Sequence, residues 1–392
     1  MTASELRAVQ NHRERWGNET SVAFAPARVN LIGEHTDYTG GLVMPMAIGF
    51  RTLALLTPRS DNKAVFYSAN FEQEAELDLN AIPLESHGEW YDYPAGVAWV
   101  LQQDGVALKG FNMTLSGDVP LGAGLSSSAS IQVATLLALA GYLGLELPLE
   151  RVATVCRRAE NEYVGAKTGI MDQFVVAGGV ENRAMMIDCR AMTYDLLPLP
   201  ESIRVVICNS MVKHQLAGGE YGDRRDEVET GQAVIAQRRP GVELLRDATL
   251  ADLEACADQM SEASLKRCRH IITENARVLA ARQVLLAGDV VAFGNLMKQA
   301  HVSFRDDFGA SCDEVDTLVE IANAIDGCLG ARITGGGFGG CTVNLVEAGR
   351  AEEFVTAVKA GYKAATGIDA DCFVCAPSDG ALALAKKSLG AE

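Results

Sequence analysis

The chain has 392 residues, of which 48% are hydrophobic and 22% charged, so its composition is that of an ordinary globular protein. Its length exceeds that of one typical domain and predicts two. The formal net charge of −17 would repel nucleic-acid phosphates over most of the surface, which argues against a nucleic-acid partner.

The sequence also argues against export and membrane insertion. Residues 1–17 carry charges throughout and lack the apolar segment of a secretory signal. The longest apolar stretch, residues 131–145, is shorter than the roughly 20 residues that a membrane-spanning helix needs, so we interpret it as a buried helix. The ten cysteines are scattered along the chain, which suits a reducing compartment. We therefore expect a cytoplasmic protein without a membrane partner.

Apolar periodicity predicts strands mixed with helices in the first half of the chain and mainly helices in the second. The predicted strands are 21–32, 51–57, 64–68, 111–116, 184–188, 203–209, 331–334, 341–346 and 371–376. The predicted helices are 127–143, 149–164, 220–237, 264–286, 289–303 and 350–365. Because these elements alternate without a regular βαβ repeat, we expect a mixed α+β fold, divided near residue 200 into domains 1–200 and 201–392.

The glycine-rich loop at residues 117–130 follows a predicted strand and leads into the predicted helix 127–143. Gly122 and Gly124 would let the backbone approach a ligand, and the three serines that follow lie where a helix N-terminus offers free N–H groups. No lysine follows the glycines, which excludes a P-loop. The loop predicts either a phosphate site or a glycine turn with serine caps.

A second glycine-rich loop, residues 334–340, contains the spacing G-x-G-x-x-G. A dinucleotide site requires a helix after this pattern, whereas here a predicted strand follows. We therefore expect a tight turn between strands that lies beside the first loop or its ligand, as a structural turn or as a wall of the active site.

Two further segments concentrate polar side chains. The stretch 26–38 contains Arg28, Asn30, Glu34, His35 and Asp37. Carboxylates accept hydrogen bonds from neighbouring hydroxyls, so this stretch predicts a polyol site, with a solvated loop as the alternative. The stretch 159–173 places Glu160 in the last turn of a predicted helix, where the macrodipole disfavours a carboxylate unless a cation neutralises it. Asp172 stands between apolar residues, and the alternative for both acids is a surface salt bridge.

The order and residues of these segments resemble those of the GHMP small-molecule kinases, and among them those of the galactokinase family. The matching segments are RVNLIGEHTDY at 28–38, GLSSSA at 124–129, GIMDQ at 169–173, EYGDRR at 220–225 and TGGGFGGC at 334–341. The resemblance spans about residues 20–376. It implies a two-domain GHMP kinase fold, with a ribosomal-protein-like N-terminal half, a ferredoxin-like C-terminal half and the active site between them.

The resemblance also implies the reaction and its residues. The reaction would be ATP-dependent phosphorylation of D-galactose at the anomeric hydroxyl by a monomer, with Mg²⁺ as cofactor and ATP as co-substrate. Catalysis would involve Asp172 and Arg28. The sugar would be bound by Glu34, His35, Thr36, Asp37, Gly169, Asp172 and Tyr221. The ATP phosphates would be bound by Gly122, Ala123, Gly124, Leu125, Ser126, Ser127 and Ser128. The metal would be held by Ser128 and Glu160.

Three residues depart from the family pattern: Ala27 replaces the usual glycine, Thr168 a frequent cysteine and Gly222 a frequent asparagine. None of the three removes a proposed chemical group. Because Ala27 lies in a predicted strand, we expect it to be extended, with negative φ. The alternatives are a non-catalytic galactose sensor of the same fold, a sugar-binding module without activity, and a kinase of N-acetylgalactosamine or another sugar.

Overall fold

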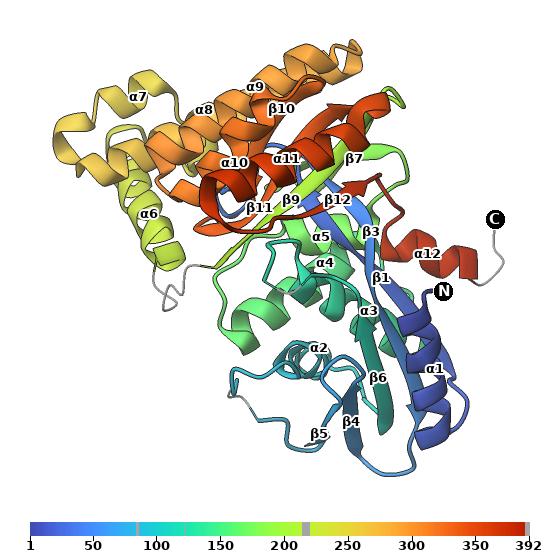
Figure 1. Cartoon of the computed structure of the whole chain (residues 1–392). Coiled ribbons are helices and arrows are strands. Elements are labelled where there is room, and N and C mark those ends of the chain that lie inside the picture. Colours follow the sequence, from blue (N-terminus) through green and yellow to red (C-terminus); the bar gives the residue numbers. More distant parts are fainter. Residues whose placement is uncertain (84–85, 121, 214–219, 389–392) are drawn as a thin grey trace.

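The computed structural model describes residues 1–83, 86–120, 122–213 and 220–388, without the side chains of residues 213, 220, 221 and 388. The first part of the chain forms a five-stranded mixed sheet with helices on both faces (Figure 1). Its strand order is β1 (Ser21–Asn30), β3 (Pro45–Pro58), β6 (Phe111–Gly117), β4 (Lys63–Ser68) and β5 (Gln73–Asp78). The helices of this part are α1 (Ala3–Trp16), α2 (Asp92–Gln103), α3 (Ser127–Leu143), α4 (Leu149–Arg158) and α5 (Met171–Gly178).

The second part of the chain forms an antiparallel four-stranded sheet. Its order is β10 (Cys328–Thr334), β11 (Gly339–Glu347), β9 (Ile203–Lys213) and β12 (Asp371–Cys375). The helices of this part are α6 (Glu220–Arg238), α7 (Leu250–Glu254), α8 (Glu262–Leu286), α9 (Val290–Ser303), α10 (Asp313–Ala324) and α11 (Ala351–Thr366). A small third sheet consists of β2 (Leu42–Val43), β7 (Arg183–Asp188) and β8 (Thr193–Pro198). The last helix, α12 (Ala381–Ser388), returns to the first part of the chain, where it contacts β1, α3 and α5.

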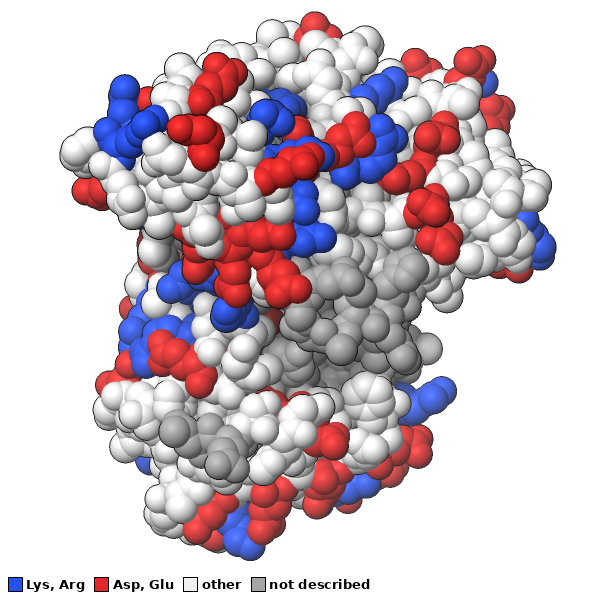
Figure 2. Space-filling model, turned by 90° about the vertical axis from the view of Figure 1, so that its left-hand side faces the viewer, with Lys and Arg blue, Asp and Glu red and all other residues white. Residues whose placement is uncertain are grey.

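The surface carries both signs of charge. On the face shown in Figure 2, Lys and Arg side chains are interspersed with Asp and Glu side chains over both parts of the molecule. Within the described ranges, no helix combines the length and the apolarity needed to cross a bilayer.

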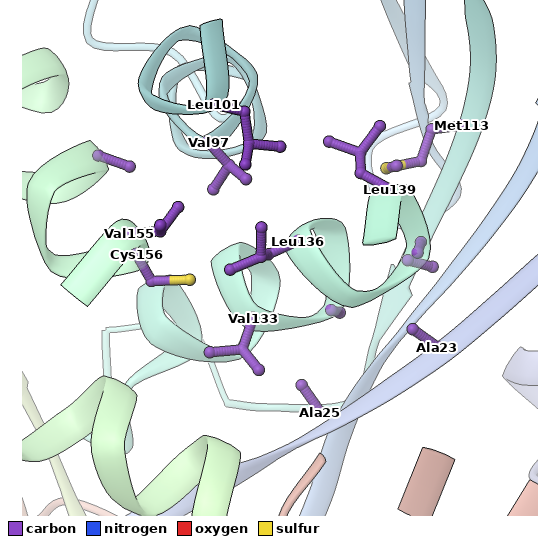
Figure 3. Packing of buried hydrophobic residues seen from close by; sticks show 14 of the residues in the cluster. Ala23, Ala25, Val97, Leu101, Met113, Val133, Leu136, Leu139, Val155 and Cys156 are labelled. Atoms are coloured by element: carbon purple, nitrogen blue, oxygen red, sulfur yellow. The ribbon is translucent and has the colours of Figure 1, made fainter. Parts of the chain in front are cut away.

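Helix α3 is apolar around most of its circumference because most of its residues are buried. Val133 and Leu136 of α3 point toward residues of α2, α4 and β1, including Val97 and Val155 (Figure 3). Such a helix has no exposed stripe to fill with polar side chains, so its sequence shows little amphipathic periodicity. The interpretation of residues 131–145 as a buried helix is thus confirmed for the part that lies in α3.

A separate core joins the two parts of the chain. Ala27 and Val29 of β1 belong to the same buried cluster as Ile207 of β9 and Val343 of β11. Ala27 is extended with negative φ, as predicted, and its side chain is fully buried at a register shift between Pro26 and Ala27. The strand that carries the first polar segment is therefore fixed directly against the second sheet.

The mixed α+β architecture and all the predicted helices and strands are present, with ends shifted by a few residues. The largest shift is at β3, which begins at Pro45 instead of residue 51. The predicted helix 149–164 is α4 followed by a π-helical turn, Ala159–Val164. The sequence analysis missed α1, α2, α7, α10, α12, β2, β5 and β8. The division of the chain at residue 200 stays a prediction.

Candidate active site

A cavity of about 190 Å³ lies where β1, the loop after it, the start of α5 and the β10–β11 turn meet. Its lining consists of Arg28, Glu34, His35, Asp37, Thr168, Gly169, Met171, Asp172, Gly335 and Gly336. Six of these residues were predicted from the sequence to act on the sugar or on catalysis. The fold thus brings three separate sequence segments around one polar cavity.

Arg28 and Asp172 form a two-pronged ion pair at this cavity. The Nε and Nη2 atoms of Arg28 each donate to one carboxylate oxygen of Asp172, at 2.7 Å. The Nη1 atom of Arg28 donates to the carbonyl oxygen of Gly124 at 2.5 Å, and the Ser126 hydroxyl donates to Asp172 Oδ2. Asp172 lies in the first turn of α5, where the helix dipole favours a negative charge. Both charged groups are therefore held rigidly beside the glycine-rich loop.

Glu34 is held from the second part of the chain. Its Oε1 atom accepts hydrogen bonds from the Gly335 backbone N–H at 2.9 Å and from the Thr334 hydroxyl at 3.2 Å. Arg332 Nη1 lies 3.5 Å from the same oxygen. Burial raises the pKa of Glu34, and the positive charge of Arg332 opposes this shift. The Glu34 carboxylate is thus positioned by β10 and by the first residues of the second glycine-rich loop.

Gly169 lies so close to the Asp37 carboxylate that position 169 has no room for a Cβ atom. A Cβ atom on Gly169 would lie 1.8 Å from Asp37 Oδ2. Burial raises the pKa of Asp37 to about 6, and the neighbouring negative charge of Asp172 adds to the shift. Because ionising a second buried carboxylate here is costly, a ligand that donates hydrogen bonds would favour the charged form.

His35 and Thr36 have different surroundings. The His35 ring is buried and stacks on Phe308 at 4.1 Å between centroids, and burial lowers the pKa of His35 to about 3, so the ring is neutral. The Thr36 hydroxyl is buried within the loop, where it contacts the carbonyl oxygens of Gly33 at 3.0 Å and Leu42 at 2.6 Å. The predicted contact by Tyr221 falls on a side chain outside the described part of the structure.

The first glycine-rich loop separates the polar cavity from a second cavity of about 180 Å³. Gly122 and Gly124 have positive φ, and α3 begins at Ser127, as predicted. The second cavity is lined by Thr52, Ser68, Asn70, Phe71, Trp90, Tyr93, Leu115, Ser116, Gly117, Val119, Ser127, Ser128 and Ile131. Ser126 contacts Asp172, which lines the polar cavity, and Ser128 lines the second cavity. Residues of this loop therefore reach both sites.

The second glycine-rich loop is a turn between antiparallel strands β10 and β11, as predicted, and it packs on the first loop. A Cβ atom on Gly335 would lie 3.2 Å from the Gly124 carbonyl oxygen, and one on Gly340 would lie 3.4 Å from that of Ala123. Both glycines have positive φ. The turn also lines the polar cavity, so the two possibilities that the sequence left open do not exclude each other. That this wall belongs to the active site stays a prediction.

Glu160 lies in the π-helical turn and is 6% exposed. Burial raises the pKa of Glu160 to about 7, the negative charge of Asp172 adds to this shift, and Ser128 and Gln173 partly oppose it. A divalent cation would suit this carboxylate and the adjacent Ser128 hydroxyl. No group of three or more His, Cys, Asp or Glu side chains in the described ranges could hold a metal. A cation here would need additional ligands such as phosphate oxygens, which is typical of Mg²⁺.

Comparisons with known proteins agree with this geometry. The model of the GHMP kinases N-terminal domain matches residues 92–179, that of the GHMP kinases C-terminal domain matches 281–364, and the galactokinase galactose-binding signature matches 10–58. The chain is 42% identical over 378 residues to the galactokinase of Chloroflexus aggregans, an alignment that covers 96% of this chain and 97% of that protein. This chain belongs to the galactokinase family. It is also 41% identical over 356 residues to the galactokinase of a Roseiflexus species, covering 91% of each chain.

Solved structures give the same result for the fold. Lactococcus lactis galactokinase complexed with galactose has a TM-score of 0.91 to this chain at 32% identity, covering 96% of this chain and 98% of that one. A mevalonate kinase at 19% identity has a TM-score of 0.63, covering 91% and 98%, and shares the fold alone. The predicted two-domain GHMP kinase fold and the predicted sugar kinase family are confirmed.

The sequence analysis missed the residues of α8 that hold the loop of residues 33–42, part of which lines the polar cavity. Glu274 Oε1 accepts from the Gly33 backbone N–H at 2.8 Å, and Asn275 Oδ1 accepts from the Leu42 N–H at 2.8 Å. His270 Nε2 lies 3.2 Å from the Glu34 carbonyl oxygen. These residues lie more than 200 positions after the loop, within an ordinary helical pattern, so no local sequence signal identified them.

Proposed function

We propose that this member of the galactokinase family transfers the γ-phosphoryl group of ATP to the anomeric hydroxyl of D-galactose, giving galactose 1-phosphate and ADP, in the cytoplasm. The observation that carries the proposal is the Arg28–Asp172 ion pair, which lies in a polar cavity and contacts the loop before the α3 N-terminus. A phosphate acceptor in the cavity and a phosphate donor on the loop would meet at this ion pair.

The cavity supplies hydrogen-bond acceptors for a sugar. Glu34 is a buried carboxylate and Asp37 a half-buried one, and each can accept hydrogen bonds from hydroxyls. Gly169 keeps the cavity wall beside Asp37 free of a side chain. His35, whose ring is neutral, adds a polar group without adding charge. A site of this kind discriminates against sugars whose hydroxyls leave its groups without partners.

The loop supplies donors for the phosphates of ATP. The chain has a net charge of −17, so attraction of an anion must come from local groups. The backbone N–H groups of residues 122–128 and the dipole of α3 provide them, and the aromatic side chains Trp90 and Phe71 of the second cavity provide a surface for the adenine ring.

Arg28 and Asp172 would carry the chemistry. Asp172 would accept the proton of the anomeric hydroxyl, or stabilise this group electrostatically, while Arg28 offsets the negative charge between Asp172 and the γ-phosphate. Phosphoryl transfer depends mainly on such positioning and charge stabilisation. Ser128 and Glu160 would hold Mg²⁺, which when bound neutralises charge on the phosphate oxygens.

A sugar panel in a coupled ADP-release assay tests this function. We expect D-galactose to be the best common hexose, with glucose lower by at least about 10³ in kcat/KM, and ³¹P NMR should show phosphate on the anomeric oxygen. Comparable turnover of N-acetylgalactosamine or glucose would contradict the proposed substrate. Galactose binding without ADP release would instead support the non-catalytic sensor.

A further inference from the structure

Arg332 is a fully buried arginine whose guanidinium lacks hydrogen-bond partners within the described part of the chain. Its side chain is 0% exposed, and its Nε, Nη1 and Nη2 atoms form no hydrogen bond to any described residue. The carboxylate with which it forms an ion pair is Glu34, at 3.5 Å. Burying a guanidinium costs several kcal/mol, so a position that needed only volume would be better served by an apolar side chain.

The alternation of β10 directs Arg332 toward Glu34, which lines the polar cavity. Ala331 and Ile333 belong to the core on one side of the second sheet. Successive side chains of a strand point to opposite faces, so Arg332 and Thr334 share the other face. Thr334 contacts Glu34 Oε1 from that face. Arg332, Thr334 and the Gly335 N–H group therefore all face the same oxygen atom, Oε1 of Glu34.

The charged and titratable groups around Glu34 come from several elements. They are Arg28 of β1, the adjacent His35, Asp37 of the 3₁₀ turn, His270 and Glu274 of α8, and Arg332 of β10. The Arg28 guanidinium is already bound by both oxygens of Asp172. Glu274 has its own cation, Arg277, whose Nε donates to it at 2.6 Å. Among these groups, Arg332 is therefore the cation that pairs with Glu34.

We propose that Arg332 is a positioning residue for sugar recognition. It keeps Glu34 ionised and keeps Oε1 against β10, so that the second carboxylate oxygen can accept hydrogen bonds from the sugar. This inference rests on the proposed function, because it takes Glu34 as a contact of galactose. Without Arg332, the buried carboxyl group would bind a proton and become a donor where the sugar needs an acceptor.

A double-mutant cycle of Arg332→Met and Glu34→Gln tests the proposal, with KM for galactose and KM for ATP measured for all four proteins. We expect Arg332→Met to raise the galactose KM at least about tenfold in the wild-type background, and less than about threefold in the Glu34→Gln background. The ATP KM should change little in either. The exposed Arg282, paired with Asp195, provides the matched control Arg282→Met, which should leave both constants unchanged.

The pH dependence separates positioning from mere packing. In Arg332→Met the galactose KM should fall as pH rises from 6 to 9, because the uncompensated Glu34 regains its charge only at higher pH. The Glu34→Gln proteins should show no such fall, and Arg332→Lys should restore most of the affinity for galactose.

Equal effects of Arg332→Met in both backgrounds, or an unchanged galactose KM, would overturn the proposal. If Arg332→Met does not fold, Arg332→Lys and Arg332→Gln provide the same comparison, and equal galactose KM values for these two would also overturn it. Failure of the wild-type protein to phosphorylate galactose would contradict the proposed function instead, and the wild-type assay alone reveals that outcome.

Discussion

Asp172 is the residue on which the proposed chemistry most directly depends. Asp172→Asn keeps the shape of the side chain but removes the negative charge that faces Arg28. We expect kcat to fall by about 10²–10⁴, the range for loss of a general base. Galactose binding, measured by calorimetry, should persist at least weakly. A variant that keeps a tenth of the wild-type turnover would show that Asp172 has another role.

Asp37 provides a pH-dependent prediction at the same scale. The pKa of Asp37 is raised from 3.8 to about 6, so between these pH values the folded state holds a proton that the unfolded state releases. The stability of the sugar-free protein should therefore fall as pH rises through this window. About two pKa units correspond to about 3 kcal/mol at most. Asp37→Asn removes this loss while weakening galactose binding.

Thermal unfolding between pH 4.5 and 7.5 without sugar checks the prediction for Asp37. The Tm advantage of Asp37→Asn over wild type should grow up to about pH 6 and then stay constant. Asp326, which is 91% exposed, offers the control substitution Asp326→Asn, for which the difference should stay near zero. A Tm difference between Asp37→Asn and wild type that does not change with pH would contradict the raised pKa of Asp37.

At the scale of elements, the active site depends on segments that pack with their backbones in contact. Helix α9 crosses strand β10 at Gly294 and Gly330. A Cβ atom on Gly294 would lie 2.3 Å from the Leu329 carbonyl oxygen, and one on Gly330 would lie 2.3 Å from the Gly294 carbonyl oxygen. This crossing fixes the strand that carries Arg332, so the glycines serve the site without touching it.

Gly294→Ala should separate α9 from β10 and lower the free energy of unfolding by about 1–3 kcal/mol, the usual cost of overpacking a core. Urea denaturation measures this change. The control is Gly349→Ala, where an added Cβ meets no atom within 4 Å and the expected change is below about 0.5 kcal/mol. Similar values for the two variants would show that the α9–β10 contact is looser than described.

At the scale of the whole molecule, the end of the chain ties the two parts together. After β12 the chain returns to the first part, where Ser378 N–H donates to the Ala47 carbonyl at 2.9 Å and Gly380 N–H donates to that of Gly179 at 2.7 Å. Ala381, at the start of α12, is fully buried in the cluster around α3. This return makes the first part of the fold depend on residues from the last.

Truncation after Ala376 should therefore lower the stability of the whole protein by about 2–4 kcal/mol, because it removes buried apolar contacts and hydrogen bonds together. We expect the Tm to fall while the galactose KM, measured well below that Tm, stays within about threefold of wild type. Lys387→Ala, which removes the ion pairs of the exposed Lys387 side chain with Asp379 and Glu181, is the control and should cost less than about 1 kcal/mol. An unchanged Tm after truncation would contradict the role of this segment.

Much of the candidate site could be predicted from the sequence because its chemistry is local. Three groups of residues can be interpreted from their sequence neighbours alone: the serines at the start of α3, the glycines of both loops and the polar side chains of residues 28–37. The extended conformation of Ala27 followed from the strand pattern around it. Short segments such as α7 and β8 were missed because a few residues carry too little periodicity to be distinguished from loops.

The sequence by itself therefore identified the groups that we propose for phosphate, sugar and metal, and it predicted part of the helices and strands. Only the tertiary structure decided that Arg332 faces Glu34, that α8 holds the loop of residues 33–42, and that Gly169 lies against Asp37. These contacts join residues more than 100 positions apart, and they depend on how two sheets pack. No local pattern encodes such packing, because any one strand could satisfy its own periodicity against many different partners.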